Sequence, residues 1–252
     1  MNFLSRPHFI FALLAIVLTV PLSFAHAANK LNDTERQEIE KMIHSYIMEN
    51  PQVILDSVQQ MQAREEESKK NQAQLNLVKY RDQLVNDPNA PIMGNPKGDV
   101  TIVEFMDYRC GYCKRVYPTL LKAMKIDGNV RVLMKEFPIL GPESVLASKA
   151  ALAVWRLTPK KYAEFHTSLM QTKSSITENL IRSIANDLGL SGDAVIKEME
   201  SPEIKKSISE NRALAQSLGI SGTPAFVIGN ELVPGAVDLG TLKGLINIAR
   251  GS

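Results

Sequence analysis

The chain has 252 residues, of which 44% are hydrophobic and 22% are charged, and its formal net charge is +2. This is the composition of an ordinary globular protein, and it argues against a disordered chain. The length suffices for one substantial core and a smaller appended module. A nearly neutral surface gives no support for nucleic acid as a partner.

The first 27 residues have the pattern of a secretory signal peptide. Arg6 precedes an apolar run over residues 9–20, and Ala25-His26-Ala27 is a small-x-small cleavage pattern. The run is shorter than the roughly 20 residues that a membrane-spanning helix needs. We therefore expect cleavage after Ala27, rather than a retained membrane anchor, and a mature chain with a net charge of +1. The expected location is the periplasm, where disulfides form and persist.

Two helices are expected next, over residues 31–50 and from Pro51 to about Val85. In the first, apolar residues recur at helical spacing, and Thr34 with Gln37 can form a capping box. The second is apolar at both ends and almost wholly polar over residues 62–74. That pattern is typical of a helix that joins two separate packing sites.

The apolar stripe of residues 31–61 needs a partner. A pair of helices this small cannot bury its stripe alone. We expect these residues to pack against a copy of themselves in another subunit, which would make the protein a homo-oligomer. Residues 28–86 would then form an oligomerisation segment with a linker helix. The alternative is that the stripe folds back onto the protein's own catalytic domain.

The main domain is expected over residues 87–252, and turn-rich sequence marks its start. Residues 100–106 and 130–137 have the pattern of buried strands, with a helix between them. A strand, crossover helix and strand of this length form a right-handed βαβ unit with parallel strands.

A helical pattern then continues over about residues 141–218, and we expect Trp155 in its core and His166 as a packed or surface residue. Strands at residues 225–228 and 231–233 and a closing helix complete the chain. The predicted fold class is therefore α/β, with an all-helical insertion.

Both cysteines lie in one CxxC, Cys110-Gly111-Tyr112-Cys113. A structural zinc site would need two more Cys or His ligands nearby, and the mature chain has only His44 and His166. Haem attachment needs a His after the second Cys, where this chain has Lys114. A structural disulfide here would close a tiny loop and restrain little of the unfolded chain. The remaining interpretation is a redox-active pair that needs no cofactor and no metal.

The position of the CxxC favours that interpretation. Where a buried strand enters a helix, the first thiol lies at the helix N-terminus, and unpaired N–H groups and the helix dipole favour an anion there. Cys110 is thus the expected nucleophile, and Cys113, one turn into the helix, is the expected resolving thiol. A thiolate attacks a disulfide sulfur, a mixed disulfide forms, and the second thiol releases it.

The order of strand, CxxC, helical insertion and Thr223-Pro224 before a strand resembles the thioredoxin fold of the DsbA family, over about residues 91–250. The N-terminal extension is similar to that of the ScsC and Com-type branch of this family. The resemblance implies that Pro224 is a cis-proline facing the CxxC, beside which substrate backbone can pair, rather than a trans turn. It also implies that Glu104, six residues before the first Cys, accepts a proton from Cys113. A mid-strand Glu could instead face solvent.

The dipeptide between the cysteines departs from the strong oxidants of the DsbA type, which carry Pro-His there. Gly111-Tyr112, with Thr223 before the proline, is similar to the site of the DsbC isomerases. The resemblance therefore implies an isomerase with some oxidase capacity, whose substrate-binding residues are Gly111, Tyr112, Thr223 and Pro224. Its partners would be cysteine-containing exported proteins and a DsbB-like or DsbD-like inner-membrane redox protein.

Three alternatives stay open from the sequence. One is a monomeric oxidase coupled to a DsbB-like partner. Another is a copper-stress protein in which the two thiols bind Cu(I), a soft ion that thiolates suit. The third is a chaperone or surface-associated binding role for the N-terminal helices.

Overall fold

The computed structural model describes residues 31–251. The chain divides into two compact units between Gln60 and Met61, and each unit is described by itself. The expected signal peptide, residues 1–27, lies outside the described residues. Within residues 31–251, no helix has the length and apolar content needed to cross a membrane.

The first unit consists of helix α1, Asp33–Glu49, and the beginning of helix α2, Gln52–Lys79. A capping box precedes α1, in which the Asn32 side chain accepts from the Glu35 N–H and the Glu35 carboxylate accepts from the Asn32 N–H, both at 2.9 Å. The prediction that Thr34 and Gln37 form this box is therefore wrong. Asn is as good an N-cap as Thr, and a carboxylate near the positive end of the helix is favoured over a neutral amide.

An apolar face of this unit is uncovered. α1 has no buried residue. Large apolar side chains are exposed along both helices: Leu31, Ile39, Met42, Ile43, Tyr46, Met48, Val53, Ile54, Leu55 and Val58. Many of them are three or four residues apart, and such neighbours lie on one side of a helix.

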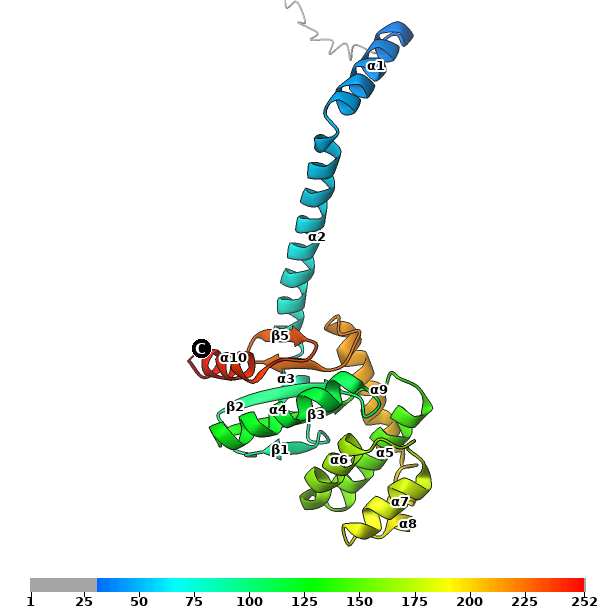
Figure 1. Ribbon diagram of the computed structural model, residues 1–252, viewed down its shortest axis with the longest axis vertical. Helices are drawn as coiled ribbons and strands as arrows, with labels where there is room; N and C mark the ends of the chain where they lie inside the picture. Colours follow the sequence, from blue (N-terminus) through cyan, green and yellow to red (C-terminus); the bar gives the residue numbers. More distant parts are fainter. Residues whose placement is uncertain (1–30, 252) are drawn as a thin grey trace, which may run out of the picture. The chain divides into compact units, whose positions relative to one another are not determined.

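The second unit is built on a five-stranded sheet with the strand order β1-β3-β2-β4-β5 (Figure 1). The strands are β1 Ile92–Gly94, β2 Val100–Met106, β3 Val130–Glu136, β4 Ala225–Ile228 and β5 Glu231–Pro234. β2 is the central strand, and it pairs parallel with β3 and antiparallel with β4. The predicted βαβ unit and terminal hairpin are confirmed. β1 has only three residues and was not predicted, because so short a strand has no readable alternation.

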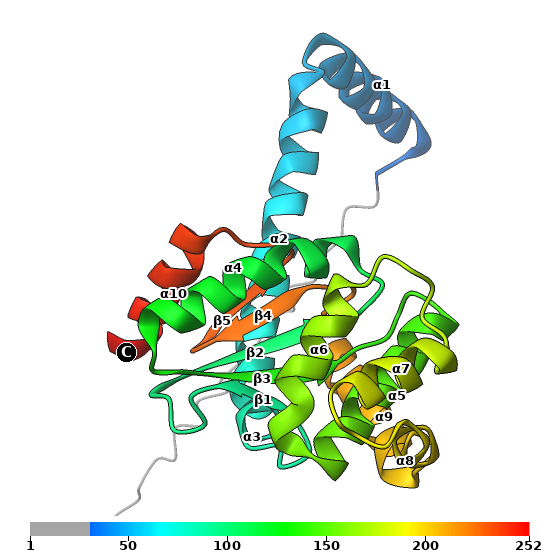
Figure 2. The same cartoon turned by 60° about the horizontal axis from the view of Figure 1, so that its bottom comes forward.

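Helices cover both faces of the sheet, as Figure 2 shows. Helices α4, Gly111–Asp127, and α10, Leu239–Gly251, pack on one face, together with Ile102 and Met134 from the strands. Helices α3, Arg81–Val85, and α9, Pro202–Ser217, pack on the other face with Val103 and Leu133. The alternation of strand side chains thus divides the core into two apolar clusters.

The insertion between β3 and β4 is all-helical in the structure, as predicted. It comprises α5 Pro142–Leu157, a 3₁₀ turn at Pro159–Lys161, α6 Tyr162–Gln171, α7 Glu178–Asp187, α8 Gly192–Glu198 and α9. Trp155 is partly buried and packs against the core cluster, with its ring edge-on to Tyr162. His166 is fully buried, so its prediction as a packed residue is confirmed.

A buried lysine ties the start of the main domain to the sheet. Lys135 on β3 is 2% exposed, and its Nζ donates to Asp87 Oδ2 at 2.5 Å and to the Gln83 carbonyl at 3.0 Å. A buried charge needs such partners. The helix predicted to continue to Val85 ends instead at Lys79, and the chain then forms the short α3, which carries Gln83 to Lys135.

Candidate active site

Cys110 lies where β2 runs into α4, and it is the N-cap residue of that helix. Its Sγ accepts from the backbone N–H of Cys113 at 3.5 Å. Cys110 is 6% exposed to solvent, whereas Cys113 is fully buried, and both are free thiols. The accessible thiol is therefore the first one, at the end of the helix where the dipole favours a thiolate.

The loop before β4 lies opposite Cys110. The Thr223–Pro224 peptide is cis, and the Thr223 carbonyl accepts from Cys110 Sγ at 3.1 Å. The Pro224 carbonyl in turn accepts from the Gly235 N–H at 2.8 Å, which holds this loop against the chain that follows β5. The structure thus brings together the two ends of the predicted site, which are separated by more than a hundred residues in the sequence.

A cavity of about 510 Å³ adjoins this loop. It is lined by Tyr112, by residues 219–225, by Leu232 and by residues 234–236. Its walls are largely apolar side chains and loop backbone, which is the chemistry needed to hold an extended peptide beside the reactive thiol.

Gly111 and Tyr112 are both exposed to solvent. Tyr112 is 59% exposed, and the Arg115 guanidinium lies over its ring at 5.0 Å from the centroid. A Cβ on Gly111 would meet no heavy atom within 4 Å. The core therefore places no steric demand on these two positions.

Asp107 fixes the approach of the chain to the CxxC. Its Oδ1 accepts from the Arg109 N–H at 2.7 Å, and its Oδ2 accepts from the Ile139 and Leu140 N–H groups at 2.8 and 3.1 Å. One buried carboxylate thus joins the loop after β2 to the loop after β3. The sequence offered only a weak signal for this role, an Asp directly after a buried strand.

Glu104 is 1% exposed and lies on β2, so the alternative that it faces solvent is excluded. Its Oε2 has no hydrogen-bond partner among the described residues. Burial, together with the charge of Glu136, raises the pKa of Glu104 from 4.5 to about 8. Burial and the charge of Glu104 also raise the pKa of the Cys113 thiol. The charge of Glu104 thus acts on the Cys113 thiol, which places the two groups near one another in the core.

A third buried carboxyl group, Glu136 at the end of β3, was not predicted. It accepts from the Tyr108 hydroxyl at 3.1 Å, the Tyr162 hydroxyl at 3.3 Å and the Ser148 hydroxyl at 2.8 Å. His166 Nδ1 lies 2.7 Å from the Tyr108 hydroxyl. Burial lowers the pKa of His166 to about 3, so the ring is neutral at physiological pH. The only sequence signal was a charged pair, Lys135-Glu136, at the end of a buried strand.

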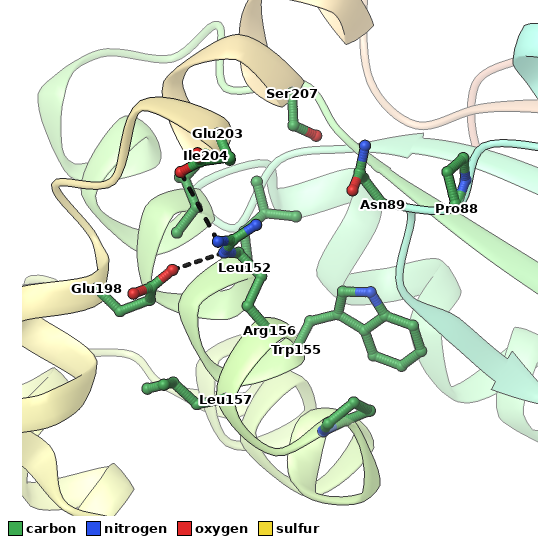
Figure 3. Close-up of a pocket in the computed structure, with 11 residues that line it drawn as sticks. Pro88, Asn89, Leu152, Trp155, Arg156, Leu157, Glu198, Glu203, Ile204 and Ser207 are labelled. Carbon is green, nitrogen blue, oxygen red and sulfur yellow. Dashed lines mark hydrogen bonds and ion pairs between the residues drawn. The ribbon is translucent and has the colours of Figure 1, made fainter.

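A different cavity, of about 530 Å³, lies between the helical insertion and the loop at Pro88 and Asn89, and it is drawn in Figure 3. The Arg156 guanidinium points into it and pairs with Glu198 at 2.6 Å and Glu203 at 3.7 Å. No cysteine lines this cavity, and none of the predicted site residues does. Among the described residues, no three or more His, Cys, Asp or Glu side chains gather where they could hold a metal ion.

A CxxC that caps a helix, faces a cis-proline loop and extends from the central strand of such a sheet defines a thiol-disulfide oxidoreductase of thioredoxin-like fold. The family model described as DSBA-like thioredoxin domain matches residues 101–247. The model described as copper resistance protein ScsC N-terminal domain matches residues 35–67. The chain belongs to the DsbA family and carries an N-terminal domain of the ScsC type.

Solved structures agree with this assignment. A thioredoxin-like oxidoreductase from Silicibacter pomeroyi is 44% identical, with a TM-score of 0.65 over 68% of this chain and 98% of that one. The catalytic domain of Proteus mirabilis ScsC is 34% identical, with a TM-score of 0.66 over 71% and 99%. A periplasmic thioredoxin-like protein from Salmonella enterica is 34% identical, with a TM-score of 0.61 over 68% and 96%.

The burial of Glu104 predicts a pH-dependent stability that Glu104→Gln removes. The pKa of Glu104 is raised from 4.5 to about 8 in the folded state. The folded state therefore holds the Glu104 proton more tightly than the unfolded state does. The contribution of this proton to the free energy of unfolding is complete below pH 4.5 and is lost as the pH rises towards 8. At pH 7 we expect Glu104→Gln to increase the free energy of unfolding of the reduced protein by about 3 kcal/mol, and at pH 4.5 by much less.

Urea unfolding at the two pH values measures the difference. Glu67→Gln is the matched control, because Glu67 is exposed on α2 and should leave the pH dependence unchanged. An equal effect of Glu104→Gln at both pH values would contradict a buried, neutral Glu104.

Proposed function

We propose that this protein is a periplasmic enzyme that forms and isomerises disulfide bonds in exported proteins, with isomerisation as its main activity. The observation that carries the proposal is the position of Cys110 Sγ, 3.1 Å from the Thr223 carbonyl and beside an apolar cavity. A substrate strand that pairs with the loop at Thr223 and Pro224 would bring its own sulfur to Cys110. Tyr112 would contact the side chains of that strand.

In the first step, the Cys110 thiolate attacks one sulfur of a substrate disulfide. A bond forms between Cys110 Sγ and that sulfur, the substrate S–S bond breaks, and the second substrate sulfur leaves as a thiolate. That thiolate can attack another disulfide of the same substrate. When a substrate thiolate finally attacks the mixed disulfide, Cys110 is released as a thiolate and the substrate is rearranged without net oxidation.

The second outcome uses Cys113. Glu104 accepts the Cys113 proton, and the new thiolate attacks Cys110 Sγ in the mixed disulfide. The Cys110–Cys113 bond forms, and the substrate leaves reduced. Run in reverse, the same step oxidises a substrate dithiol. A DsbD-like inner-membrane partner would return Cys110 to the thiol form, and a DsbB-like partner would return the disulfide.

The dipeptide supports isomerisation over strong oxidation. A His next to the first Cys stabilises its thiolate and makes the disulfide more oxidising, and Gly111-Tyr112 supplies no such charge. The likeness to a periplasmic protein from Salmonella enterica supports the proposed location, after cleavage behind Ala27. In the Cu(I) alternative the described residues would offer only the two thiols, since no third ligand of the kinds named above joins them.

Turnover of a scrambled-disulfide substrate tests the enzyme. Cys110→Ser should reduce isomerisation to the uncatalysed rate, because Cys113 is fully buried and cannot replace the nucleophile. Cys113→Ser should still attack, and it should accumulate a mixed disulfide that gel electrophoresis detects. Undiminished turnover by Cys110→Ser would remove the enzyme interpretation of this site. Rapid oxidation of a reduced substrate, with a scrambled one left unchanged, would overturn the isomerase assignment in favour of an oxidase.

Tyr112→His tests the role of the dipeptide. An imidazole beside Cys110 should stabilise its thiolate and so make the enzyme disulfide more oxidising. We expect the equilibrium constant with glutathione to change by about tenfold, which corresponds to about 30 mV. Tyr112→Phe is the control, since it keeps the ring without a titratable imidazole. An unchanged equilibrium constant for Tyr112→His would show that the dipeptide does not set the direction of the reaction.

We also propose that residues 31–61, within the N-terminal segment 28–86, bind the same residues of other subunits. The exposed apolar face of α1 and of the beginning of α2 supports this, because a water-exposed stripe of this size is costly unless a partner covers it. The match of residues 35–67 to an ScsC N-terminal domain supports it as well. A homo-oligomer would hold several catalytic domains near one substrate, as an isomerase needs.

Ile43→Glu in the full mature chain tests this segment. Ile43 is 53% exposed in the single chain, so a glutamate there should not disturb the fold of one subunit. We expect the unchanged protein to be oligomeric by light scattering at micromolar concentration, Ile43→Glu to be largely monomeric, and the control Lys41→Glu to remain oligomeric. A monomeric unchanged protein would contradict the proposal. A monomeric Ile43→Glu that isomerises equally well would show that isomerisation does not need the oligomer.

A further inference from the structure

The register of the central strands places Glu104 and Glu136 on one face of the sheet. Glu104 is opposite Met134, and Met106 is opposite Glu136. Because side chains alternate along a strand, Glu104, Met106, Met134 and Glu136 all point to the face that α4 covers. The two carboxyl groups are therefore diagonal neighbours, and they are 1% and 0% exposed.

The surroundings of the two carboxyl groups differ. Glu136 accepts from three hydroxyl groups, those of Tyr108, Tyr162 and Ser148. Glu104 Oε2 has no partner among the described residues. Hydrogen bonds donated to a carboxylate stabilise its charged form. The negative charge of the pair is therefore better accommodated on Glu136, which has three hydroxyl donors where Glu104 Oε2 has none.

A charge on Glu136 acts directly on Glu104. Two buried carboxyl groups on one face repel each other when both are ionised, and the pKa of one is then raised. The charge of Glu136 is the electrostatic cause, after burial, of the raised pKa of Glu104. Glu104 therefore retains its proton in a range of pH where a lone buried carboxyl would already have begun to lose it.

We propose that Glu136 is a positioning residue for thiol-disulfide exchange, whose charge, held by three hydroxyl donors, keeps the proton on Glu104 and so sets the pH at which Cys113 can be deprotonated. The inference rests on the proton-acceptor role proposed above for Glu104. It adds a residue that touches neither the substrate nor the reacting sulfurs, and it assigns the Tyr108, Tyr162 and Ser148 hydroxyls a role in the same step.

The other titratable groups around the pair do not supply this charge. Cys113 and Tyr117 face Glu104 from α4, and burial raises the pKa of both. Tyr162 and His166 face Glu136 from α6. Burial keeps the pKa of Tyr162 well above 10 and lowers that of His166 to about 3, so both are neutral near pH 7.

The loop after β2 contributes Asp107 and Tyr108. Burial raises the pKa of Glu136 to about 8, against the lowering effect of its three hydroxyl donors, and the charge of Asp107 adds to the rise. Burial keeps the pKa of Tyr108 well above 10. The group around the pair whose charge acts on Glu104 is therefore Glu136 itself.

His166 fixes the direction of the hydroxyl donors. A tyrosine hydroxyl has one hydrogen, and those of Tyr108 and Tyr162 are directed at Glu136. In the 2.7 Å hydrogen bond between the Tyr108 hydroxyl and His166 Nδ1, Nδ1 is therefore the donor and the hydroxyl oxygen accepts. Nε2 is left without a hydrogen, and it has no partner among the described residues. The neutral ring thus holds the tyrosine oxygens as acceptors and their hydrogens towards Glu136.

The affected step is the release of the mixed disulfide by Cys113. The Cys113 thiol gives its proton to the Glu104 carboxylate, and the resulting thiolate attacks Cys110 Sγ. The Cys110–Cys113 bond forms as the bond from Cys110 to the substrate sulfur breaks, and the substrate thiolate leaves with the electron pair. The step needs Glu104 ionised beforehand, so the charge of Glu136 determines how much of the enzyme is ready at a given pH.

Glu136→Gln tests the proposal by two measurements. Carbon-13 titration of the Glu104 carboxyl reads its ionisation without any activity. We expect its midpoint to fall by at least about one pH unit when the neighbouring charge is removed. Stopped-flow mixing of the reduced enzyme with a symmetrical aromatic disulfide measures the rate at which attack by Cys113 releases the second aromatic thiol. This rate falls at low pH as Glu104 is protonated, and we call that part of the pH profile the acid limb. In Glu136→Gln the acid limb should shift to lower pH by the same amount.

Ser148→Ala removes one hydroxyl donor and leaves the carboxyl group in place. With one donor fewer, Glu136 carries less negative charge, so the Glu104 titration midpoint and the acid limb should both shift to lower pH, but by less than in Glu136→Gln. This variant replaces Glu136→Gln as the test if Glu136→Gln does not fold. Glu164→Gln, an exposed change on α6, is the control and should shift neither. An unchanged Glu104 midpoint in folded Glu136→Gln or, failing that, in Ser148→Ala would overturn the proposal.

Glu104→Gln separates this inference from the role of Glu104. If the acid limb persists in Glu104→Gln, Glu104 is not the proton acceptor and the proposal fails at its foundation. If the limb disappears there but Glu136→Gln leaves it in place, Glu104 is the acceptor and only the role of Glu136 is wrong.

Discussion

The site depends on one constraint, the burial of β2 between β3 and β4 and its unbroken passage into α4. Within residues 104–110 this segment supplies a buried carboxyl group, the aspartate that ties two loops together, a hydroxyl donor and the accessible thiol. Pairing on both edges prevents the strand from shifting in register. The cis-proline loop enters β4, the neighbour of β2, so the same pairing sets the distance between Cys110 and Thr223.

The sequence predicted those parts of the protein that depend on local pattern. The CxxC, the strands around it and the helical insertion are read from short motifs and from periodicity, and the cis-proline follows from the resemblance to the DsbA family. The parts that it did not predict depend on register. Whether Glu136 meets solvent or three hydroxyl groups is decided by β3 pairing with β2 and by α5 and α6 crossing its end. No pattern within β3 contains that information. Lys135 and Asp87 pair for the same reason.

The two faces of the sheet differ in how their buried ionisable groups are paired. On one face, Lys135 has an oppositely charged partner and a carbonyl acceptor, and it fastens the start of the domain to β3. On the other, Glu104 has an oxygen without a partner, beside a second carboxyl group and a buried thiol. A satisfied pair contributes to structure, whereas an unsatisfied group costs folding free energy and is kept where its reactivity is used.

The open surroundings of Gly111 and Tyr112 let these two positions change without disturbing the fold. Most residues that touch a reactive group are also packed into the core, so replacing them costs stability. Here the two positions between the cysteines have almost no packing to lose. Descendants of one such ancestor could therefore diverge into oxidants and reshuffling enzymes by exchanging two surface residues, while the scaffold beneath them stayed the same.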